Sequence, residues 1–527
     1  KQQSAGGPIT KDNTSVEYYD TVFVISPSPV QKGVIWAASD DGLVHITQND
    51  GQSWTDVTPK GFPEWSTVSQ IDASHHNAGT AYVAINNYRQ DDFKPYIFKT
   101  TDFGRSWRAI TNGIRATDFV HAVRQDPVNP RLLFAGTEGG VYVSFDDGEN
   151  WQSLQMNLPH VPIYDLMVKD NDLIVATHGR AFWSLDDIGA LRDGGAQVNA
   201  DARLFKPSVA WRTRRGGGFQ LPGSAHVGAN PPNGAVIDFY LKSAPSGPVT
   251  LDVLDSGGKL VRHFSTERPP QPRRRPQAAG EFSAEEEFFG PPPARLNAHA
   301  GLNRFTWDLR GESAATVPGL AVWGGRAQGM FAMPGQYQVR LTANGKSETQ
   351  PLEIKLDPRL KVTTEDLRQQ HDLGNRIWDD INRANSEANR MIDLRSQLDD
   401  LEYRLSQSNN PQAKQLSDQA KALDKKIDDV ENLVVQPRSH AGEDPLNYPI
   451  KLANKLLDLL GTVESADTAP TAQSAQVFQM LDGELKNALQ QWQQIQTSDL
   501  ASFNAALQKA NVGTLFAPEP KSAGAGE

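Results

Sequence analysis

The sequence contains no cysteine, which excludes disulfides, thiolate metal sites and a cysteine nucleophile. It also lacks an apolar run approaching the roughly 18 residues of a membrane-spanning helix, so we predict no transmembrane segment. The net charge of −11 leaves no excess of basic residues for a nucleic-acid surface. No sequence pattern of a metal or nucleotide site is present, and we therefore predict no metal, no cofactor and no nucleic-acid partner.

The chain of 527 residues is too long for one compact domain, and about two to four domains are expected. It begins at Lys1 without an initiator methionine and without a leader-like apolar segment. We therefore expect a processed or truncated product that has lost its leader.

The first part of the chain contains a repeat. The stretch "SFDDGENW" (144–151) shares a pattern with "TQNDGQSW" (47–54) and "TTDFGRSW" (100–107). In each, Ser or Thr is followed at fixed spacing by Asp or Asn, then Gly, then Trp. The matched positions are Thr47, Asn49, Gly51 and Trp54; Thr100, Asp102, Gly104 and Trp107; and Ser144, Asp146, Gly148 and Trp151.

The copies lie about 40 to 50 residues apart, and each is embedded in short β-type runs, a period typical of propeller blades. We predict four blades over residues 1–195, with a fourth strand unclear in the last blade. Four blades are fewer than such propellers usually have. We therefore expect part of a larger propeller, completed by a missing N-terminal half or by another chain. Residues 1–14 are expected to form a loop between blades.

The Ser/Thr-x-Asp-x-Gly-x-x-Trp pattern resembles the Asp-box, or bacterial neuraminidase (BNR) repeat, of β-propellers. The run "DNDLIVATHGRAFWSLDDIGALR" (170–192) resembles the end of the propeller in bacterial proteins called sortilin-like or "glycosyl hydrolase, BNR repeat". This resemblance implies an extracytoplasmic protein, periplasmic or secreted. Sialidases, xyloglucanases and sortilin-type receptors all carry such repeats, so the resemblance points to a fold and leaves the activity open.

Beyond the blades, residues 196–232 are rich in Gly, Pro and Arg and are expected to form a connector. Residues 233–358 alternate apolar and polar positions between turn signals, which predicts an antiparallel sandwich of immunoglobulin or fibronectin type. The runs "GLNRFTWDLRG" and "PGQYQVRLTANG" resemble the accessory sandwich of the same bacterial proteins. Residues 267–296 are proline-rich with blocks of charge and are expected to be a disordered insertion.

The C-terminal third changes to helical periodicity. Apolar residues recur in steps of three and four from Thr364, the expected N-cap, and "SNNPQ" separates this helix from a second. Further helices are expected at about 446–461, 473–497 and 499–510. We predict a helical hairpin with a small bundle over residues 363–515, used for packing or oligomerisation, and a disordered tail at 516–527.

The repeated Asp favours a structural role over a catalytic one. In such a turn the side chain of Asp146 accepts backbone N–H groups, the Trp inserts between blade strands, and the Gly adopts a conformation that other residues avoid. Asn49 fits this role because an amide oxygen accepts equally well, whereas a catalytic acid would not tolerate the exchange. Asp50 and Asp147 occupy the following, variable position and are expected to be solvated turn residues.

A functional candidate is the aligned position before the first glycine of each repeat, where loops of successive blades converge near the propeller axis. The ligand-binding candidates are Asp41, Glu138, His178, Arg180, Trp65 and Tyr88, with Phe93 and Tyr96 extending an aromatic rim suited to sugars. The alternative is that these polar side chains end strands and bind water or the neighbouring blade.

An enzyme remains an alternative. A glycosidase needs two carboxylates about 5 to 9.5 Å apart. Asp41 and Glu138 are the weak catalytic candidates, and Asp72, Asp118 and Asp165 could also supply one of the pair. A sialidase would use an arginine cluster and a tyrosine nucleophile. The available residues are Arg89, Arg124 and Arg180 with Tyr88 or Tyr164, but the N-terminal arginine motif of sialidases is absent.

The favoured interpretation is a mainly β protein with an α-helical C-terminal region, acting as an extracytoplasmic sortilin-like scaffold. Its propeller would bind a protein, peptide or glycan ligand, and its sandwich and helices would serve docking or assembly. The alternatives are a xyloglucanase-like glycoside hydrolase and a structural subunit of a multi-chain assembly.

Overall fold

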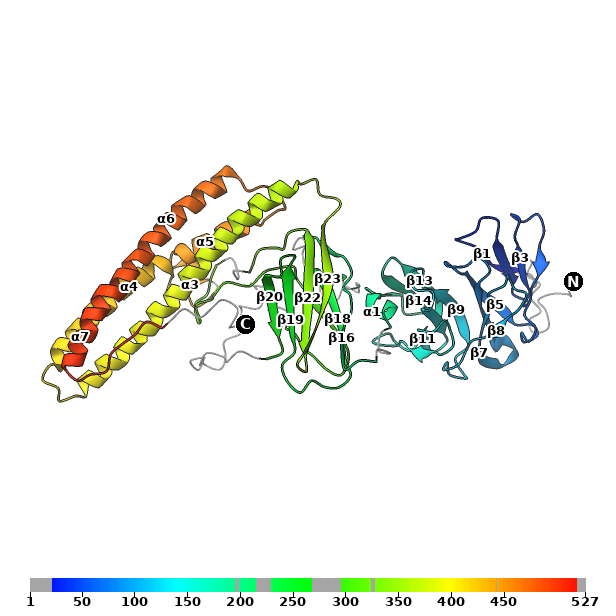
Figure 1. Ribbon diagram of the computed structural model, residues 1–527, viewed down its shortest axis with the longest axis horizontal. Helices are drawn as coiled ribbons and strands as arrows, with labels where there is room; N and C mark the ends of the chain where they lie inside the picture. The colour runs from blue at the N-terminus through cyan, green and yellow to red at the C-terminus, as the bar shows by residue number, and fades with distance from the viewer. Residues whose placement is uncertain are drawn as a thin grey trace. The chain divides into compact units, whose positions relative to one another are not determined.

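The computed structural model describes residues 21–194, 199–214, 228, 230–267, 295–323, 328–441 and 443–518, which form two compact units, Lys1–Asn199 and Ala200–Glu527 (Figure 1). The predicted loop at 1–14, residues 268–294 of the predicted insertion and residues 519–527 of the predicted tail lie outside the described residues.

The first unit consists of four antiparallel sheets in which each strand pairs with the next along the chain. Blade 1 is β1 (Val22–Pro27), β2 (Ile35–Ser39), β3 (Val44–Thr47) and β4 (Thr55–Asp56); blade 2 is β5 (Thr67–Ala73), β6 (Ala81–Asn87), β7 (Asp92–Thr100) and β8 (Arg108–Ala109); blade 3 is β9 (Val120–Gln125), β10 (Leu133–Thr137), β11 (Gly140–Ser144) and β12 (Gln152–Ser153); blade 4 is β13 (Ile163–Lys169), β14 (Asp172–Thr177) and β15 (Phe182–Leu185). This up-and-down order is that of propeller blades, and it confirms the predicted fold class for this unit. A short helix, α1 (Gly189–Arg192), follows blade 4.

Three apolar layers separate the four blades. Every residue of β10 is buried, because Leu133 packs toward blade 2 and Phe134 toward blade 4. In β2 and β14, buried residues instead alternate with half-buried ones. Blades 2 and 3 therefore bury both faces, whereas blades 1 and 4 each bury one face within the part of the chain that the structure describes.

The repeated turn follows the third strand of blades 1 to 3 and ties its own backbone. In blade 3, the hydroxyl of Ser144 donates to Asp146 Oδ1 (2.8 Å) and accepts the backbone N–H of Gly148 (2.9 Å). The backbone N–H of Asn150 donates to the same Asp146 oxygen (2.9 Å). The copies at Thr100 and Thr47 repeat this arrangement, with Asn49 Oδ1 accepting in place of a carboxylate. In the second copy, the hydrogen bond from Ser106 holds the pKa of Asp102 below its usual range.

The tryptophans of the second and third repeats bond to the preceding blade. Trp107 Nε1 donates to the carbonyl oxygen of Val57, directly after β4 (2.8 Å). Trp151 Nε1 donates to the carbonyl oxygen of Ile110, directly after β8 (2.7 Å). Each of these two turns is therefore a clamp between two blades.

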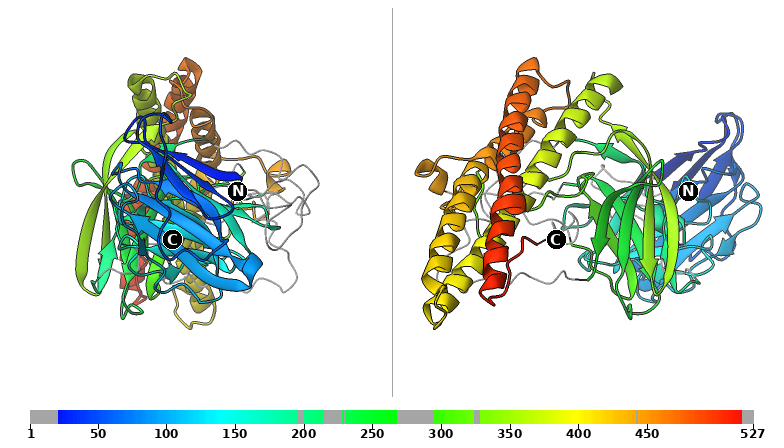
Figure 2. Two further views of the ribbon diagram at one scale, coloured as in Figure 1. Left: turned by 90° about the vertical axis from the view of Figure 1, so that its right-hand side faces the viewer. Right: turned by 60° about the vertical axis from the view of Figure 1, so that its left-hand side comes forward.

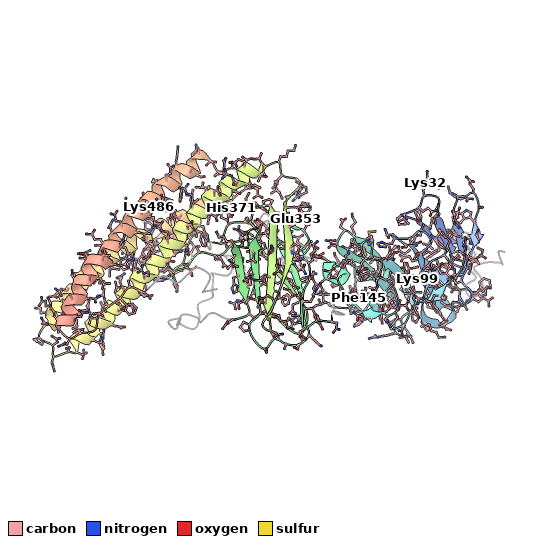
Figure 3. The ribbon with its side chains drawn as sticks, in the orientation of Figure 1. Lys32, Lys99, Phe145, Glu353, His371 and Lys486 are labelled. Atoms are coloured by element: carbon pink, nitrogen blue, oxygen red, sulfur yellow. The ribbon has the colours of Figure 1, made fainter. Side chains whose placement is uncertain are left out.

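Asp147 is also more than the solvated turn residue expected from the sequence. Its carboxylate accepts the hydroxyl of Tyr82 (2.6 Å) and the ammonium of Lys99, both in blade 2. Figure 3 labels Lys99 on its strand, β7. Burial and the neighbouring Asp147 together raise the pKa of Tyr82, so its hydroxyl stays protonated and remains a donor.

The second unit begins with a β-sandwich. One sheet is β16 (Ala202–Leu204), β18 (Ala235–Leu241) and β21 (Gly301–Trp307); the other is β17 (Ala210–Arg212), β23 (Lys346–Leu356), β22 (Gly335–Ala343), β19 (Thr250–Asp255) and β20 (Leu260–Ser265). Two of these strands, β16 and β17, come from the segment that the sequence suggested was a connector. In addition, β17 pairs with β23 in parallel, so the sandwich is not purely antiparallel.

Helices make up the rest of this unit. They are α3 (Thr364–Ser406), α4 (Ala413–Val434), α5 (Leu452–Val463), α6 (Ala472–Gln494), a π-helical segment (Ile495–Leu500) and α7 (Ala501–Lys509), with a 3-10 turn at Asp444–Leu446. Figures 1 and 2 show α3, α4 and α6 side by side. Among the described helices, none is long and apolar enough to cross a membrane.

Three helical predictions need correction. The N-cap of α3 is Thr363, one residue before the predicted Thr364. Its side chain accepts the backbone N–H of Asp366, and the Asp366 carboxylate accepts the backbone N–H of Thr363, which together form a capping box. The two last predicted helices form one continuous run because the π-helical segment joins them. Residues 516–518 of the predicted tail lie on α3, where Gln397 and Arg390 donate to the carbonyl oxygens of Phe516 and Pro518.

A buried polar cluster joins the sandwich to the helices within this unit. Asp467 accepts Arg212 Nη2 (2.6 Å) and Arg214 Nε (2.9 Å), and Glu464 accepts Arg310 Nη1 (2.9 Å). The same three guanidinium groups lie over the ring of Phe331. These pairs offset part of the cost of burying the charges, while Arg212 Nε, Arg214 Nη2 and Asp467 Oδ2 remain without a hydrogen-bond partner among the described residues.

Candidate functional site

The first strand of each blade carries one extra residue relative to its partner strand. The extra residues are Phe23, Ser69, His121 and Tyr164, each between two residues that pair normally. Such a bulge redirects a side chain and often lies beside a functional site. The extra residue carries a ring in blades 1, 3 and 4, and in blades 3 and 4 it lies opposite the end of the second strand, beside the turn to the third.

These two bulges lie at the centre of a row of rings that crosses blades 2, 3 and 4. Tyr88 stacks on Phe119 (centroids 5.0 Å apart), and Phe119 meets the edge of His121 (5.0 Å). His121 contacts Tyr164 (4.4 Å), which stacks on His178 at 4.7 Å and 13°. We call Tyr88, Phe119, His121, Tyr164 and His178 the ring row.

The ring row is buried at its centre and open at its surface. Phe119 and His121 are buried, whereas Tyr164 is 48% exposed and His178 is exposed. Phe93 packs beside Phe119 (6.1 Å) and is itself 47% exposed. The row therefore presents partly exposed rings on a buried aromatic base, at the start of the first strands.

The polar groups of the row are fixed by their neighbours. His121 Nε2 lies 2.9 Å from the carboxylate of Glu138, in the turn after β10. Burial lowers the pKa of His121, although Glu138 opposes this effect, so the imidazole is neutral at pH 7. A neutral imidazole can bond the carboxylate only with a proton on Nε2, which fixes the tautomer. Burial also raises the pKa of Tyr164, with Tyr88 and Glu138 adding to the effect, so its hydroxyl stays a donor.

Next to the row, the inner strands are cross-linked by a polar network. Arg124 in β9 donates to Asp72 of blade 2 (3.2 Å) and to Asp165 of blade 4 (3.0 Å). Gln70 of blade 2 also donates to Asp165 (2.7 Å). Burial raises the pKa of Asp72, opposed by Arg124. The side chains of three blades thus meet across the axis, and both carboxylates serve to hold the blades together.

The structure brings three of the predicted residues together: Glu138, His178 and Tyr88 all belong to the ring row or contact it. Asp41 does not. The backbone N–H of Glu138 and that of His178 each donate to the carbonyl oxygen of the residue just before the first strand of their blade. In blade 1 the corresponding hydrogen bond runs from Asp40 to Thr21, so Asp40 and not Asp41 is the structural counterpart. The blade 1 turn is one residue longer, so the sequence alignment placed Asp41 one position off.

The remaining candidates make other contacts. Asp41 accepts the hydroxyl of Ser39 in its own turn. The guanidinium of Arg180 donates to the carbonyl oxygen of Gly179, within the turn that carries His178. Trp65 lies just before β5 and is 36% exposed. Tyr96, placed in the aromatic rim, donates to Asp92 (2.6 Å), and burial with this carboxylate raises its pKa to about 12.

Two residues of the row escaped sequence reasoning. Phe119 and His121 lie in "FVHAVRQ", which reads as an ordinary strand start, and Tyr164 was considered only as a sialidase nucleophile. His121 and Tyr164 are the extra residues of their strands, a feature that depends on the register with the partner strand and leaves no mark in the sequence itself. Phe119 lies directly before β9. Among the residues that the structure describes, no group of three His, Asp or Glu side chains is placed to hold a metal ion.

No family model and no curated protein matches the chain. Solved structures match parts of it. YCF48 bound to D1 peptide is 16% identical with a TM-score of 0.26, covering 32% of this chain and 52% of that one. YCF48 from Cyanidioschyzon merolae is 18% identical with a TM-score of 0.25, covering 32% and 54%. A GH74 enzyme from Niastella koreensis is 12% identical with a TM-score of 0.25, covering 64% and 55%.

The chain spans about half the length of the two YCF48 chains it matches. At TM-scores this low the matches carry no argument about activity. The propeller assignment rests on the four sheets and the repeated turns of the chain itself.

Proposed function

We propose that the first unit binds a peptide segment of another protein along the ring row. The observation that carries the proposal is the continuity of the row: five rings from three blades contact one another in sequence, and Tyr164 and His178 remain open to solvent. Partly exposed aromatic side chains on a rigid base are typical of binding hot spots.

The stacking within the row favours a peptide over a glycan. A sugar binds an aromatic residue by lying on an open ring face. Tyr164 has one face on His178, and Tyr88 lies between Phe119 and the guanidinium of Arg89 (5.0 Å). The row offers apolar ring surface, which suits apolar side chains, together with tyrosine hydroxyls and an imidazole, which can bond backbone amides.

Hydrolysis is less well supported because the candidate carboxylates bind groups of the chain. Glu138 contacts His121, and Asp118 accepts the hydroxyl of Tyr142 (2.8 Å). Asp72 and Asp165 bind Arg124. These contacts give each of the four carboxylates a structural use within the first unit.

The finer assignment to a sortilin-like scaffold outside the cytoplasm remains part of this proposal. It is supported by the Asp-box pattern and by the run at 170–192, and the helical region would then serve association with other chains. Purification of the protein from fractionated cells of its natural host tests the location directly.

The binding proposal is tested by applying the chain to an array of random-sequence peptides and to an array of oligosaccharides. We expect retained peptides, and we expect Tyr164→Ala to weaken the best of them by about tenfold or more, about 1.4 kcal/mol. Val128→Ala is the control, because Val128 is 64% exposed in the turn between β9 and β10, at the other end of the strands. Binding or cleavage of oligosaccharides alone, or peptide binding unaffected by Tyr164→Ala, would contradict the proposal.

A further inference from the structure

The outer face of blade 1, which points away from blade 2, is apolar and exposed. Phe23 is 59% exposed, Ile25 66% and Trp54 45%. Trp54 is the tryptophan of the first repeated turn, and its counterpart Trp151 is only 5% exposed. The same position of the repeated turn is therefore exposed in blade 1 and buried in blade 3.

In blades 2 and 3 the glycine of the turn is shaped to fit the preceding blade. A β-carbon on Gly104 would lie 2.6 Å from Cβ of Val57, and one on Gly148 would lie 2.5 Å from Cδ1 of Ile110. Val57 and Ile110 are also the residues whose carbonyl oxygens accept the tryptophan N–H. One aliphatic residue, directly after the fourth strand of the preceding blade, therefore receives both the Gly and the Trp.

Blade 1 has the same turn, but no described residue of another blade packs against its Gly51. Gly51 has φ +83, like its counterparts, yet a β-carbon there would meet only Trp54 Nε1, at 3.8 Å. The backbone of the turn is nevertheless fully formed, since Thr47, Asn49 and Ser53 make the same internal hydrogen bonds. The turn that clamps a blade is therefore formed, but the aliphatic residue that would receive its Gly and Trp is not among the described residues.

We propose that this face is the docking surface for a further four-stranded blade, carried N-terminally to blade 1 in the natural polypeptide. An aliphatic residue directly after the fourth strand of this further blade would pack on Gly51. The carbonyl oxygen of the same residue would accept the N–H of Trp54 Nε1. The position follows from chain order, because blade 2 clamps onto blade 1 and blade 3 onto blade 2.

A second copy of this chain is a poorer occupant. The open face at the other end of the arc belongs to blade 4, whose sheet has three strands within the described range. It therefore offers no residue after a fourth strand, which is the element that receives the turn in both observed contacts. Exposed Met167 and Phe182 on blade 4 supply apolar surface without that acceptor.

The test places the photo-crosslinking amino acid p-benzoylphenylalanine at position 54 or at position 107, in the protein produced by its natural host. Position 107 is the control and is expected to crosslink to the segment around Val57. Position 54 is expected to crosslink within the same molecule, to a segment N-terminal to blade 1 at an aliphatic residue that follows a short strand. A crosslink to a second copy or to another protein, or none at 54 when 107 reacts, would overturn the proposal.

A second measurement does not depend on crosslinking. Trp54→Phe removes the indole N–H and leaves a ring, so we expect it to lower the melting temperature of the natural protein but not that of the 527-residue chain. Trp107→Phe is expected to lower both. Equal effects of Trp54→Phe in the two proteins would also overturn the proposal.

Discussion

His121 illustrates how one residue can gain a position that its own sequence context does not announce. The bulge in β9 places its ring between Phe119 and Tyr164, and the turn after β10 supplies Glu138 to its Nε2. Because burial lowers its pKa, the unfolded chain binds a proton here more readily than the folded one. The contribution of His121 to stability is therefore full above its unfolded pKa of about 6.5 and declines as the pH falls below it.

Asp380 of α3, in the helical region, changes the stability with pH in the opposite direction to His121. Its side chain is 6% exposed, and burial together with the nearby carboxylate of Asp482 raises its pKa to about 6. Its unfolded value is about 3.9. The folded chain therefore binds the proton more readily, so this group destabilises the fold above pH 6, and the penalty disappears as the pH falls toward 4.

We expect Asp380→Asn to stabilise the helices by about 1–2 kcal/mol at pH 7.5 and to have little effect near pH 4.5. The measurement is urea unfolding followed by circular dichroism at both pH values. Asp429→Asn is the control, since Asp429 is 63% exposed and its pair with Lys425 lies on the surface of one helix. A gain of equal size at both pH values would show that the charge of Asp380 is not its cause.

At the level of elements, the repeated turn explains why the blades stack in order. The glycines of all three copies adopt positive φ, but only Gly104 and Gly148 are also pressed against a neighbouring blade. Conformation and packing therefore make separate demands on the same residue.

Comparing Gly148→Ala with Gly51→Ala separates the cost of the positive φ from the cost of packing against the preceding blade. In the 527-residue chain both variants bear the left-handed strain of about 1–2 kcal/mol. Gly148→Ala also forces a methyl group against Ile110, an overpacking cost of about 1–3 kcal/mol more. Guanidinium unfolding of the first unit, followed by tryptophan fluorescence, measures both. If the two variants lose the same stability, the contact between turn and preceding blade contributes nothing.

The same elements show what the sequence could and could not predict. The strands and the repeat were visible because apolar alternation and the Gly and Trp positions are local. The partners of Trp107 and Trp151 were not, because they lie 50 and 41 residues away in the preceding blade. Of the site, Glu138 and His178 were predicted from their aligned position before a glycine, and Tyr88 was predicted as part of an aromatic rim, whereas the place of His121 depends on a bulge register. Asp41 was misplaced by a turn one residue longer than its counterparts.

At the scale of the whole molecule, the two units carry different kinds of surface. The first unit holds the ring row and the open face of blade 1, and its interior charges are used to cross-link blades. The second unit holds its sandwich and helices together through Asp467, Glu464 and the arginines around Phe331. We propose recognition as the role of the first unit and association with other chains as the role of the second.

The most direct test of this account is amide hydrogen exchange of the full chain with and without a peptide selected on the array. We predict slower exchange at the starts of β9 and β13 and in the turn that carries His178, with no change at the opposite turn around Val128. Tyr164→Ala should abolish the protection at all three segments. Protection confined to the outer strands of the blades, or to the sandwich and helices, would show that the ring row is not the binding site.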